Sequence, residues 1–237
     1  MAGGADPAIA LDLLTRGAVT LKGRMPRSSN ATFLVELALD GTTALAVYKP
    51  ERGERPLWDF PPGLFRREIA AYLLSEALGW GLVPATAPRE GPYGDGSLQL
   101  FVPADFRHHY FTLLEQAEHR EALQRICLFD LVVNNADRKS GHCLYVPDDR
   151  IYAIDNGLTF HAESKLRTVI WDFGEEPIAA ALLDDVRRVV DDGLPRALAD
   201  LLDPDEQRAL KRRARGLLRS GRFPVDQSGL RYPWPLI

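Results

Sequence analysis

Two aspartates, Asp137 and Asp155, stand on either side of a stretch that the sequence predicts to be a short hairpin. Its strands are expected at 143–146 and 150–154, joined by a Pro-Asp-Asp turn at 147–149. Proline presets φ and aspartate bonds its own backbone, so this tripeptide is typical of a turn. Because a tight hairpin brings its two ends together, we expect the two carboxylates to converge. One carboxylate can take a proton while the other holds a metal ion, which is the chemistry of a metal–nucleotide site.

The composition is that of an ordinary globular chain, with 237 residues, 46% of them hydrophobic and 26% charged. A net charge of -4 gives no electrostatic case for nucleic acid as a partner. Cys127 and Cys143 both lie in apolar runs, which favours buried thiols in a reducing compartment. No run reaches the roughly 18–20 apolar residues of a membrane span, and the N-terminus lacks the basic region of a signal peptide. We expect a cytoplasmic protein without a transmembrane segment, and leave peripheral membrane contact open.

The first part of the chain is predicted to be rich in β-structure. A short helix is expected to begin at Pro7, with Asp6 as its cap, and to stop at Gly17. Asp40-Gly41 is a strong hairpin signal, and an amphipathic helix is expected at 64–78. The predicted strands are 18–23, 32–39 and 43–48, followed by a hairpin within 83–103 whose tip is 91–96.

The second part is predicted to be mainly helical, with a helix at 111–129 and proline-punctuated helices within 177–219. Asp203-Pro204 has the pattern of a helix cap followed by a first helical residue. The composition changes near Pro103, so we expect two lobes, 1–102 and 103–237. The fold class is then α+β, a two-lobed, protein-kinase-like fold with a β-rich N-lobe carrying one helix and a mainly helical C-lobe.

Four charged residues follow the order of the protein-kinase signature. That signature has a strand Lys paired with a helix Glu, then a catalytic Asp, four residues and a metal-binding Asn, and finally a metal-binding Asp. Here Lys49 ends a predicted strand and Glu68 lies in the predicted helix, while Asp137 and Asp155 follow in the second part. His142 stands where the signature has Asn. Each element alone is a weak signal, and the four in this order predict a kinase.

The chain resembles the phosphatidylinositol 3-/4-kinase-like branch of the kinase superfamily, most of all the type II phosphatidylinositol 4-kinases and more distantly the HipA-type kinases. Its Asp-Asn-Gly sequence at 155–157 replaces the Asp-Phe-Gly of ordinary protein kinases. After residue 160 the resemblance fades. The segments that carry it are SSNATFLV (28–35), YKP (48–50), REIAAYLLSEALG (67–79), LVP (82–84), SLQLFV (97–102), NNADR (134–138) and AIDNGLTF (153–160).

The resemblance implies ATP as a cofactor, bound mainly by the first lobe. Lys49 would contact the α- and β-phosphates, and Glu68 would hold the Lys49 ammonium in place. The turn of Ser28, Ser29 and Asn30 would cover the phosphates with N–H groups and hydroxyls. The residues expected to form the hinge that pairs with adenine are Gln99, Leu100, Phe101 and Val102.

The resemblance also implies roles in the second lobe. Asp137 would orient the acceptor hydroxyl or take its proton, Arg138 would contact phosphate or order the loop, and Asp155 would ligate Mg²⁺. His142 departs from the pattern, because Mg²⁺ prefers oxygen to imidazole. Three readings follow: a weak second metal position, use of Mn²⁺, or direct contact of His142 with a phosphate. The cysteine-rich lipidation segment of type II lipid kinases is missing, which weighs against a lipid substrate.

We therefore predict a phosphotransferase that moves the γ-phosphoryl of ATP to a hydroxyl of a protein, a lipid or a small molecule. Two alternatives stay open, a nucleotide-binding pseudokinase and a nucleotidyl transferase on the same fold. The run at 105–110 holds two adjacent histidines without a third ligand at a telling spacing, which favours a polar segment over a metal site. The basic stretch at 208–222 is interpreted as a solvated helix face, and the tail RYPWPLI at 231–237 as an extended segment against the body.

Overall fold

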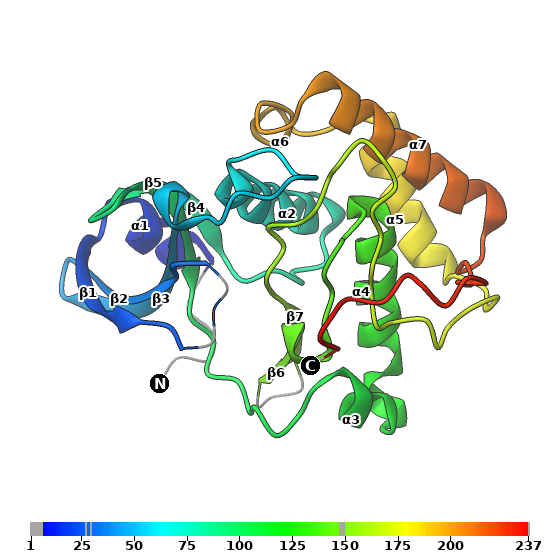
Figure 1. The fold of residues 1–237 in the computed structure, drawn as a ribbon, viewed down its shortest axis with the longest axis horizontal. Helices are drawn as coiled ribbons and strands as arrows, with labels where there is room; N and C mark the ends of the chain where they lie inside the picture. Colours follow the sequence, from blue (N-terminus) through cyan, green and yellow to red (C-terminus); the bar gives the residue numbers. More distant parts are fainter. Residues whose placement is uncertain (1–6, 27, 29, 147–149, 237) are drawn as a thin grey trace. The chain divides into compact units, whose positions relative to one another are not determined.

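The structure is a computed structural model that describes residues 7–26, 28, 30–146 and 150–236 (Figure 1). Its contacts divide the chain into two compact units. Unit 1 consists of Met1–Tyr72 and Val83–Pro103, and unit 2 of Leu73–Leu82 and Ala104–Ile237. The lobe limits expected from the sequence, 1–102 and 103–237, stay a prediction. Asp6, Ser29 and the turn at 147–149 lie outside the described residues.

Unit 1 is built on an antiparallel sheet, as the sequence predicts. The strands run in the order β1-β2-β3-β5-β4, and every neighbouring pair is antiparallel. Asp40 and Gly41 form the β2–β3 turn with φ of 48° and 80°, the left-handed values that this type of hairpin requires. The elements are α1 (Pro7–Arg16), β1 (Ala18–Arg24), β2 (Phe33–Leu39), β3 (Thr42–Pro50), the 3₁₀ turn η1 (Glu51–Gly53), β4 (Thr86–Gly91), β5 (Gly94–Leu100) and the first part of α2 (Leu64–Leu78).

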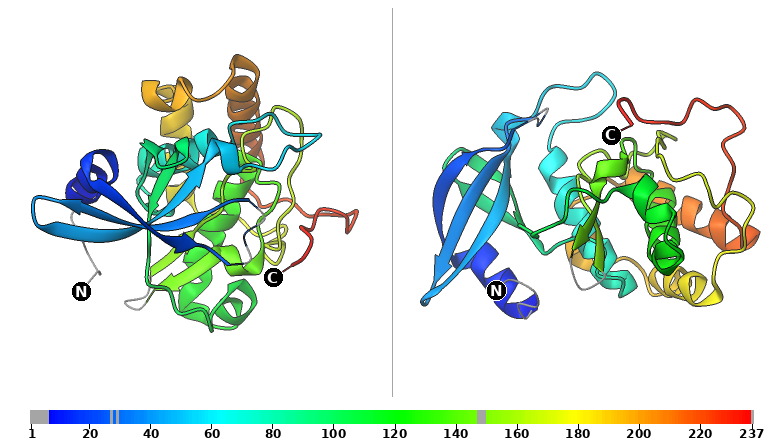
Figure 2. Two further views of the ribbon diagram at one scale, coloured as in Figure 1. Left: turned by 60° about the vertical axis from the view of Figure 1, so that its left-hand side comes forward. Right: turned by 90° about the horizontal axis from the view of Figure 1, so that it is seen from below.

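The core of unit 1 lies between α1 and the sheet. Leu13 and Leu14 of α1 are buried together with alternate residues of the strands, among them Val35, Leu37 and Leu98. Burial of every second residue is what one covered face of an antiparallel sheet produces. Figure 2 shows α1, in blue, beside the strands from two further directions. The guanidinium of Arg89 donates to the carbonyls of Thr15 and Gly17 and so caps the end of α1.

Helix α2 has the bounds that the sequence predicts, but it is not amphipathic. Its exposed side chains are Arg66 and Glu76, and the residues between them are buried or partly buried. Small and polar residues on the predicted wet side, such as Ser75, are buried as well, so a one-sided apolar pattern is the wrong description. The carboxylate of Glu54 fixes the start of α2, accepting hydrogen bonds from the backbone N–H of Gly63 at 2.9 Å and Phe65 at 2.8 Å.

Unit 2 is mainly helical, with one small hairpin. The predicted helix at 111–129 is wrong in its continuity, because the chain breaks near Gln116 into a short helix, a 3₁₀ turn and a longer helix that runs on to Val133. The predicted strands of the hairpin are confirmed. The elements are the end of α2, α3 (Tyr110–Leu114), η2 (Ala117–His119), α4 (Arg120–Val133), η3 (Ser140–His142), β6 (Cys143–Val146), β7 (Arg150–Ala153), α5 (Ala180–Asp191), α6 (Arg196–Ala199) and α7 (Pro204–Ser220).

Helix α4 forms the centre of unit 2. Its last three turns are almost wholly buried, and it contacts α3, α7 and β7. Helix α7 starts with the predicted cap, since Asp203 at the N-cap and Glu206 three residues later form a capping box, with Pro204 as the first helical residue. Cys127 and Cys143 are both free and buried, and burial raises the pKa of each thiol. Among the described helices, none is long and apolar enough to cross a membrane.

Candidate functional site

The loop that carries Asp137 follows directly from the end of α4. Asn134 ends the helix in a left-handed conformation (φ 58°), which asparagine tolerates better than most residues. Its side-chain amide donates to the carbonyls of His161 and Glu163, and its side-chain oxygen accepts the N–H of Lys165 at 3.0 Å. The chain therefore leaves α4 in a fixed direction. We call residues 134–142 the Asp137 loop.

Asp137 is held at both its backbone and its side chain. Its N–H donates to the Asn135 side chain at 2.9 Å, and its carboxylate oxygen lies 2.9 Å from the Lys139 ammonium. The Asp137 side chain keeps 26% of its surface accessible. Burial raises the pKa of Asp137, the neighbouring Lys139 lowers it, and the charge of Asp155 raises it again, with a net upward shift. A partly exposed carboxylate with a raised pKa is suited to accept a proton.

Arg138 lies at the centre of a buried polar network beneath this loop. Its side chain has no exposed surface and makes a two-pronged ion pair with Asp130 of α4, with N–O distances of 2.9 Å on each prong. The same guanidinium donates to the carbonyl of Ile154 at 2.6 Å and to the side chain of Asn156 at 2.7 Å. Burial alone would lower the pKa of Arg138, but the Asp130 carboxylate raises it. Arg138 thus joins α4 to the chain on either side of Asp155.

Asp155 projects from the end of the small hairpin. Its backbone is left-handed (φ 59°) and its side chain is half exposed. The next residue, Asn156, is buried and donates to the carbonyl of Ala153 at 3.1 Å, which closes the turn. The His142 Nε2 atom lies 3.4 Å from an Asp155 oxygen, and the Lys139 N–H points at His142 Nδ1 at 3.4 Å. The two predicted acidic groups are therefore in one unit, linked through Lys139 and His142.

These donors fit a hard divalent cation that also binds phosphate. No cluster of three or more His, Cys, Asp or Glu side chains with metal-binding geometry occurs among the described residues. Magnesium does not require such a cluster, because it commonly binds through one or two carboxylates and takes its other ligands from phosphates and water. Asp155 supplies an accessible carboxylate of this kind, and Asp137 supplies a second one close enough to be affected by its charge.

In unit 1 the predicted Lys–Glu pair is present. Lys49 comes from β3, where it lies opposite Ser97 of β5, and its ammonium is in direct contact with the carboxylate of Glu68 on α2. The Glu68 side chain is 3% exposed and that of Lys49 is 21% exposed. The ammonium is therefore oriented by a buried carboxylate, on a lysine side chain that stays partly accessible.

Most of the other residues of unit 1 that the sequence predicts to bind nucleotide are hydrogen-bonded within the protein. The Ser28 hydroxyl bonds that of Thr32, the Asn30 side chain accepts the N–H of Arg55, and Ser29 lies outside the described residues. Gln99 is buried and donates to Thr86. The N–H groups of Leu100 and Phe101 donate to the carbonyls of Ala85 and Leu45, so an adenine ring would have to pair with other backbone groups, such as those of Val102.

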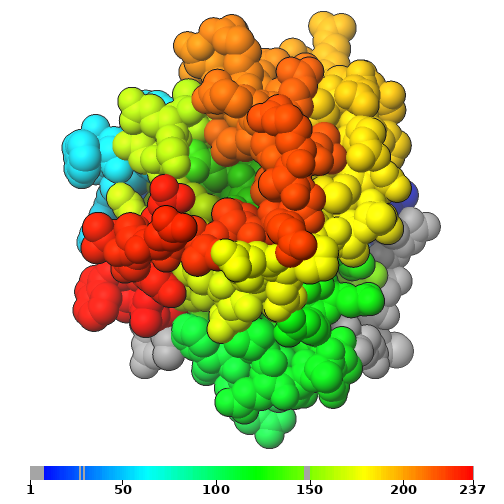
Figure 3. Space-filling model, turned by 90° about the vertical axis from the view of Figure 1, so that its right-hand side faces the viewer, coloured from blue at the N-terminus to red at the C-terminus, as the bar shows by residue number. Residues whose placement is uncertain are grey.

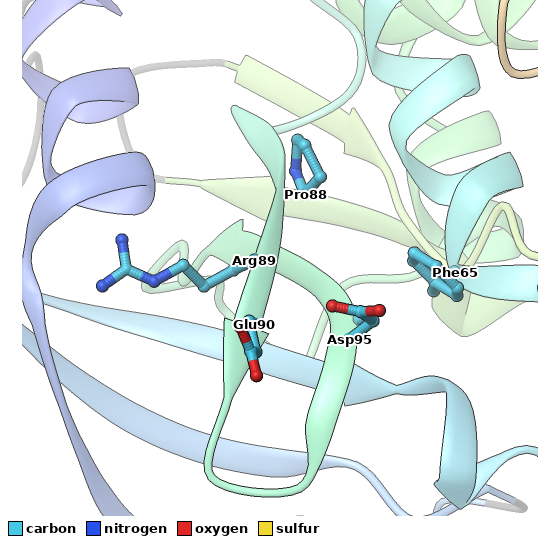
Figure 4. A pocket seen from close by; sticks show the side chains of 6 residues that line it. Phe65, Pro88, Arg89, Glu90 and Asp95 are labelled. Carbon is cyan, nitrogen blue, oxygen red and sulfur yellow. The ribbon is translucent and has the colours of Figure 1, made fainter.

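A separate hollow of about 210 Å³ in unit 1 does not suit the phosphates (Figure 4). It is lined by Phe65 of α2 and by the β4–β5 hairpin, including Glu90 and Asp95. These two acidic residues are paired directly across the hairpin, and Figure 4 shows Arg89 pointing away from Asp95. Two carboxylates would repel a phosphate, so we do not assign the nucleotide to this hollow.

Sequence reasoning missed the residues that hold the loops. These are Asp130, Asn135, Lys139 and Asn156. A signal existed for Asp130, because an acidic residue in the apolar run of α4 needs a buried partner. Lys139 had a weaker signal in its position next to Asp137 and Arg138. The buried asparagines have no pattern of their own in the sequence.

Solved structures of kinases share the fold of this chain. The Golgi casein kinase, solved with Mn and ADP bound, aligns with a TM-score of 0.59 over 98% of this chain and 81% of its own at 14% identity. Hydra Fam20, solved with sugar, gives 0.57 over 89% and 86% at 14% identity. The Helicobacter pylori proinflammatory kinase CtkA gives 0.52 over 89% and 94% at 11% identity. The kinase-like fold expected from the sequence is confirmed.

No protein-family model matches the chain. The protein Rv2133c of Mycobacterium tuberculosis is 40% identical over 260 aligned residues, which cover 94% of each chain. This chain belongs to the same family as Rv2133c. The name of that protein states no activity, so the chemistry has to be argued from the site. The likeness to type II phosphatidylinositol 4-kinases stays a prediction.

Proposed function

We propose that this chain is an ATP-dependent phosphotransferase that moves the γ-phosphoryl group of ATP to a hydroxyl acceptor. The observation that carries this proposal is the buried Arg138 network. It joins the loop of Asp137 to the loop of Asp155 through four hydrogen-bonded groups, Asp130, Ile154, Asn156 and Arg138 itself. A fully buried ion pair is costly to desolvate, and here it fixes two partly exposed carboxylates on adjacent loops. Such fixed carboxylates are what positioning and proton transfer in a kinase site require.

In this proposal unit 1 binds the phosphates of ATP. The Lys49 ammonium, oriented by Glu68, would contact the α- and β-phosphates. Ser28 and Asn30 stand on the segment that would cover the phosphates, together with Ser29. The adenine would pair with the backbone at Val102, because the N–H groups of Leu100 and Phe101 are already used inside the sheet.

In unit 2, Asp137 would act on the acceptor. Its carboxylate would accept the proton of the attacking hydroxyl as the new bond from that oxygen to the γ-phosphorus forms. The bond from the γ-phosphorus to its bridging oxygen breaks, and ADP leaves. Lys139 lies 2.9 Å from the same carboxylate and would hold it in place between turnovers. The complete burial of Arg138 supports a role in ordering the loops over one in contacting phosphate.

Asp155 would hold a divalent metal ion, Mg²⁺ or Mn²⁺, together with the phosphates. When bound, the metal would neutralise negative charge on the phosphates and on the transferred group. His142 accepts the Lys139 N–H at Nδ1, so its Nε2 carries the hydrogen that faces Asp155. We therefore assign His142 to orienting Asp155 in place of direct metal binding at Nε2. Asp155 would then be the principal metal ligand of the chain.

The acceptor is left as a hydroxyl of a protein, a lipid or a small molecule. The resemblance to phosphatidylinositol kinases makes phosphatidylinositol a necessary probe. We keep the cytoplasm as the proposed location, which the two free thiols support.

The test uses the purified chain with ATP labelled in turn at the γ- and the α-phosphate, with Mg²⁺ or Mn²⁺. Label released or transferred from γ-labelled ATP alone is the expected result. Transfer of the α-label to an acceptor would identify a nucleotidyl transferase instead. If ATP raises the melting temperature and neither label is turned over, the chain is a pseudokinase and the proposal is wrong.

A further inference from the structure

The C-terminal segment Arg231–Leu236 runs along the Asp137 loop, a contact that the proposed phosphotransferase reaction does not by itself explain. Both belong to unit 2. Figures 1 and 2 show the segment, in red, ending beside the start of β6, and Figure 3 shows it at the surface of the unit. The sequence predicts an extended segment there, and the structure shows what it binds.

At its Arg231 end, the segment lies as a third extended chain beside the paired backbones of Arg138 and Thr168. Arg138 and Thr168 form a parallel bridge, in which the Arg138 N–H donates to Arg167 at 3.0 Å and the Val169 N–H donates to Arg138 at 3.1 Å. On the other side, the Thr168 N–H donates to the Arg231 carbonyl at 3.0 Å. The Trp171 indole N–H donates to the same carbonyl at 3.2 Å. The backbone at Thr168 is thus bonded to the loop through its neighbours and to the segment directly.

The other end of the segment reaches the Asp137 loop itself. The Ser140 N–H, at the first position of η3, donates to the Leu236 carbonyl at 2.9 Å. Ser140 directly follows Lys139, whose ammonium contacts Asp137. The first N–H groups of a short helical turn have no partner inside the turn, so this carbonyl satisfies a donor that would otherwise be unpaired.

The segment enters this position from a turn that is closed by hydrogen bonds to Asp226. The Asp226 carboxylate accepts the backbone N–H and the hydroxyl of Ser228, at 3.0 and 2.6 Å, and the N–H of Arg231 at 3.0 Å. These hydrogen bonds, led by that of Ser228, lower the pKa of Asp226. Pro233 is buried within the segment. The segment is therefore anchored before it reaches the loop as well as at its two contacts.

We infer that Arg231–Leu236 acts as a built-in strand that positions the Asp137 loop and occupies the backbone edge beside it, so that the acceptor is a small hydroxyl compound and not an extended polypeptide. This inference rests on the proposed phosphotransferase function. Extended polypeptides commonly bind by adding a strand to a free backbone edge. Here the N–H groups of Thr168 and Ser140, on the strip next to Asp137, are already bonded to the chain's own segment. A small acceptor can approach Asp137 without displacing that segment.

A substitution at Ser140 tests the contact with little other change. Ser140→Pro removes the N–H that Leu236 accepts, and proline suits the first position of a helical turn. Lys139 is extended (φ -88°, ψ 163°), as a residue before proline must be. Ser140→Ala is the matched control, because it keeps the N–H and removes a buried hydroxyl that has no hydrogen-bond partner among the described residues.

The first readout is hydrogen exchange at the Thr168 amide, which needs no enzymatic activity. We expect slow exchange in the wild type and in Ser140→Ala, and faster exchange in Ser140→Pro, because a segment that has lost its Leu236 contact opens more often at Thr168 even though its Asp226 and Trp171 hydrogen bonds remain. Exchange at Thr168 as fast in the wild type as in Ser140→Pro would overturn the positioning role of the segment.

The second readout is transfer from γ-labelled ATP to dephosphorylated casein, an extended polypeptide probe. We expect the wild type to turn over ATP with casein as a minor acceptor, and Ser140→Pro to label casein at least tenfold faster. Casein labelling by the wild type close to its total ATP turnover would overturn the acceptor class. So would a Ser140→Pro variant that frees the segment and still leaves casein unlabelled. If the wild type turns over no ATP, the proposed function fails, and the exchange readout alone decides the role of the segment.

Discussion

In unit 1 the charged pair Lys49–Glu68 is supplied by a strand and a helix, whereas in unit 2 Asp137 and Asp155 are carried by loops. Regular elements place side chains through backbone geometry alone, so Lys49 meets Glu68 once the sheet and α2 have formed. Loops have no such periodic constraint. In unit 2 the constraint is provided by buried side chains, with Arg138 and Asp130 fully buried beneath the loop surface.

The difference suggests that the Lys49–Glu68 pair serves ligand binding, whereas Arg138 serves the stability of unit 2. The Lys49 side chain remains partly accessible, as the proposed contact with phosphate requires. The Arg138 guanidinium is inaccessible and serves three partners, Asp130, Ile154 and Asn156. We therefore expect changes at the unit 1 pair to alter ligand affinity, and changes at Arg138 to alter the fold of unit 2 first.

The largest effect is expected for Arg138→Met. Removing one partner of a buried pair leaves the Asp130 carboxylate uncompensated, at a cost of about 3–5 kcal/mol. Thermal unfolding should show a melting temperature lower by roughly 6–20 °C, since about 1 kcal/mol corresponds to about 2–4 °C in a chain of this size. Arg187→Met, at an exposed arginine of α5, is the control and should unfold like the wild type. An unchanged melting temperature for Arg138→Met would show that the network does not hold unit 2.

The next effect concerns the double variant Lys49→Met/Glu68→Gln. Removing both charges together avoids leaving either one buried without the other, so the melting temperature should stay close to that of the wild type. Loss of a charge-assisted contact to phosphate should weaken ADP binding by about 1.5–3 kcal/mol, roughly 10–100-fold. Titration calorimetry with ADP measures this change. Full ADP affinity in the double variant would remove Lys49 from the phosphate site.

A smaller effect is expected for the metal preference of His142→Asn. In the proposal His142 does not bind the metal, so an asparagine amide oxygen at this position would add a hard oxygen ligand. The ratio of Mg²⁺-supported to Mn²⁺-supported turnover should then rise several-fold. The measurement is the rate of ATP turnover at saturating concentrations of each metal. A ratio that does not change would indicate that residue 142 does not influence the metal at Asp155.

The smallest effect is a shift in pH dependence for Lys139→Met. The Lys139 cation lowers the pKa of Asp137, against the larger effect of burial. Without it the pKa of Asp137 rises further, so the basic form is lost at a higher pH as the solution is acidified. The acidic limb of the kcat–pH profile should move to higher pH. Lys22→Met, at a lysine of a surface ion pair in unit 1, should leave that limb in place.

The sequence predicts the features that depend on local patterns, namely strands, hairpin turns, helix bounds and helix caps. Alternating strands, the Asp40-Gly41 hairpin, the bounds of α2 and the Asp203 cap were all readable, because each depends on local backbone chemistry. The break near Gln116 was not, since the apolar period continues across it. The side chains that fix the two acidic loops were also beyond prediction, because Asp130 and Asn156 meet Arg138 only in the folded unit.

The central claim is that Asp137 acts on the acceptor while nucleotide is bound elsewhere. It is tested most directly by Asp137→Ala beside the wild type, with Asp200→Ala as an exposed aspartate control. The readouts are ATP turnover and ADP affinity in the same preparation. We predict a loss of turnover of about 10²–10⁴-fold with ADP affinity nearly unchanged, and a control that behaves as the wild type. Full turnover by Asp137→Ala would contradict the account.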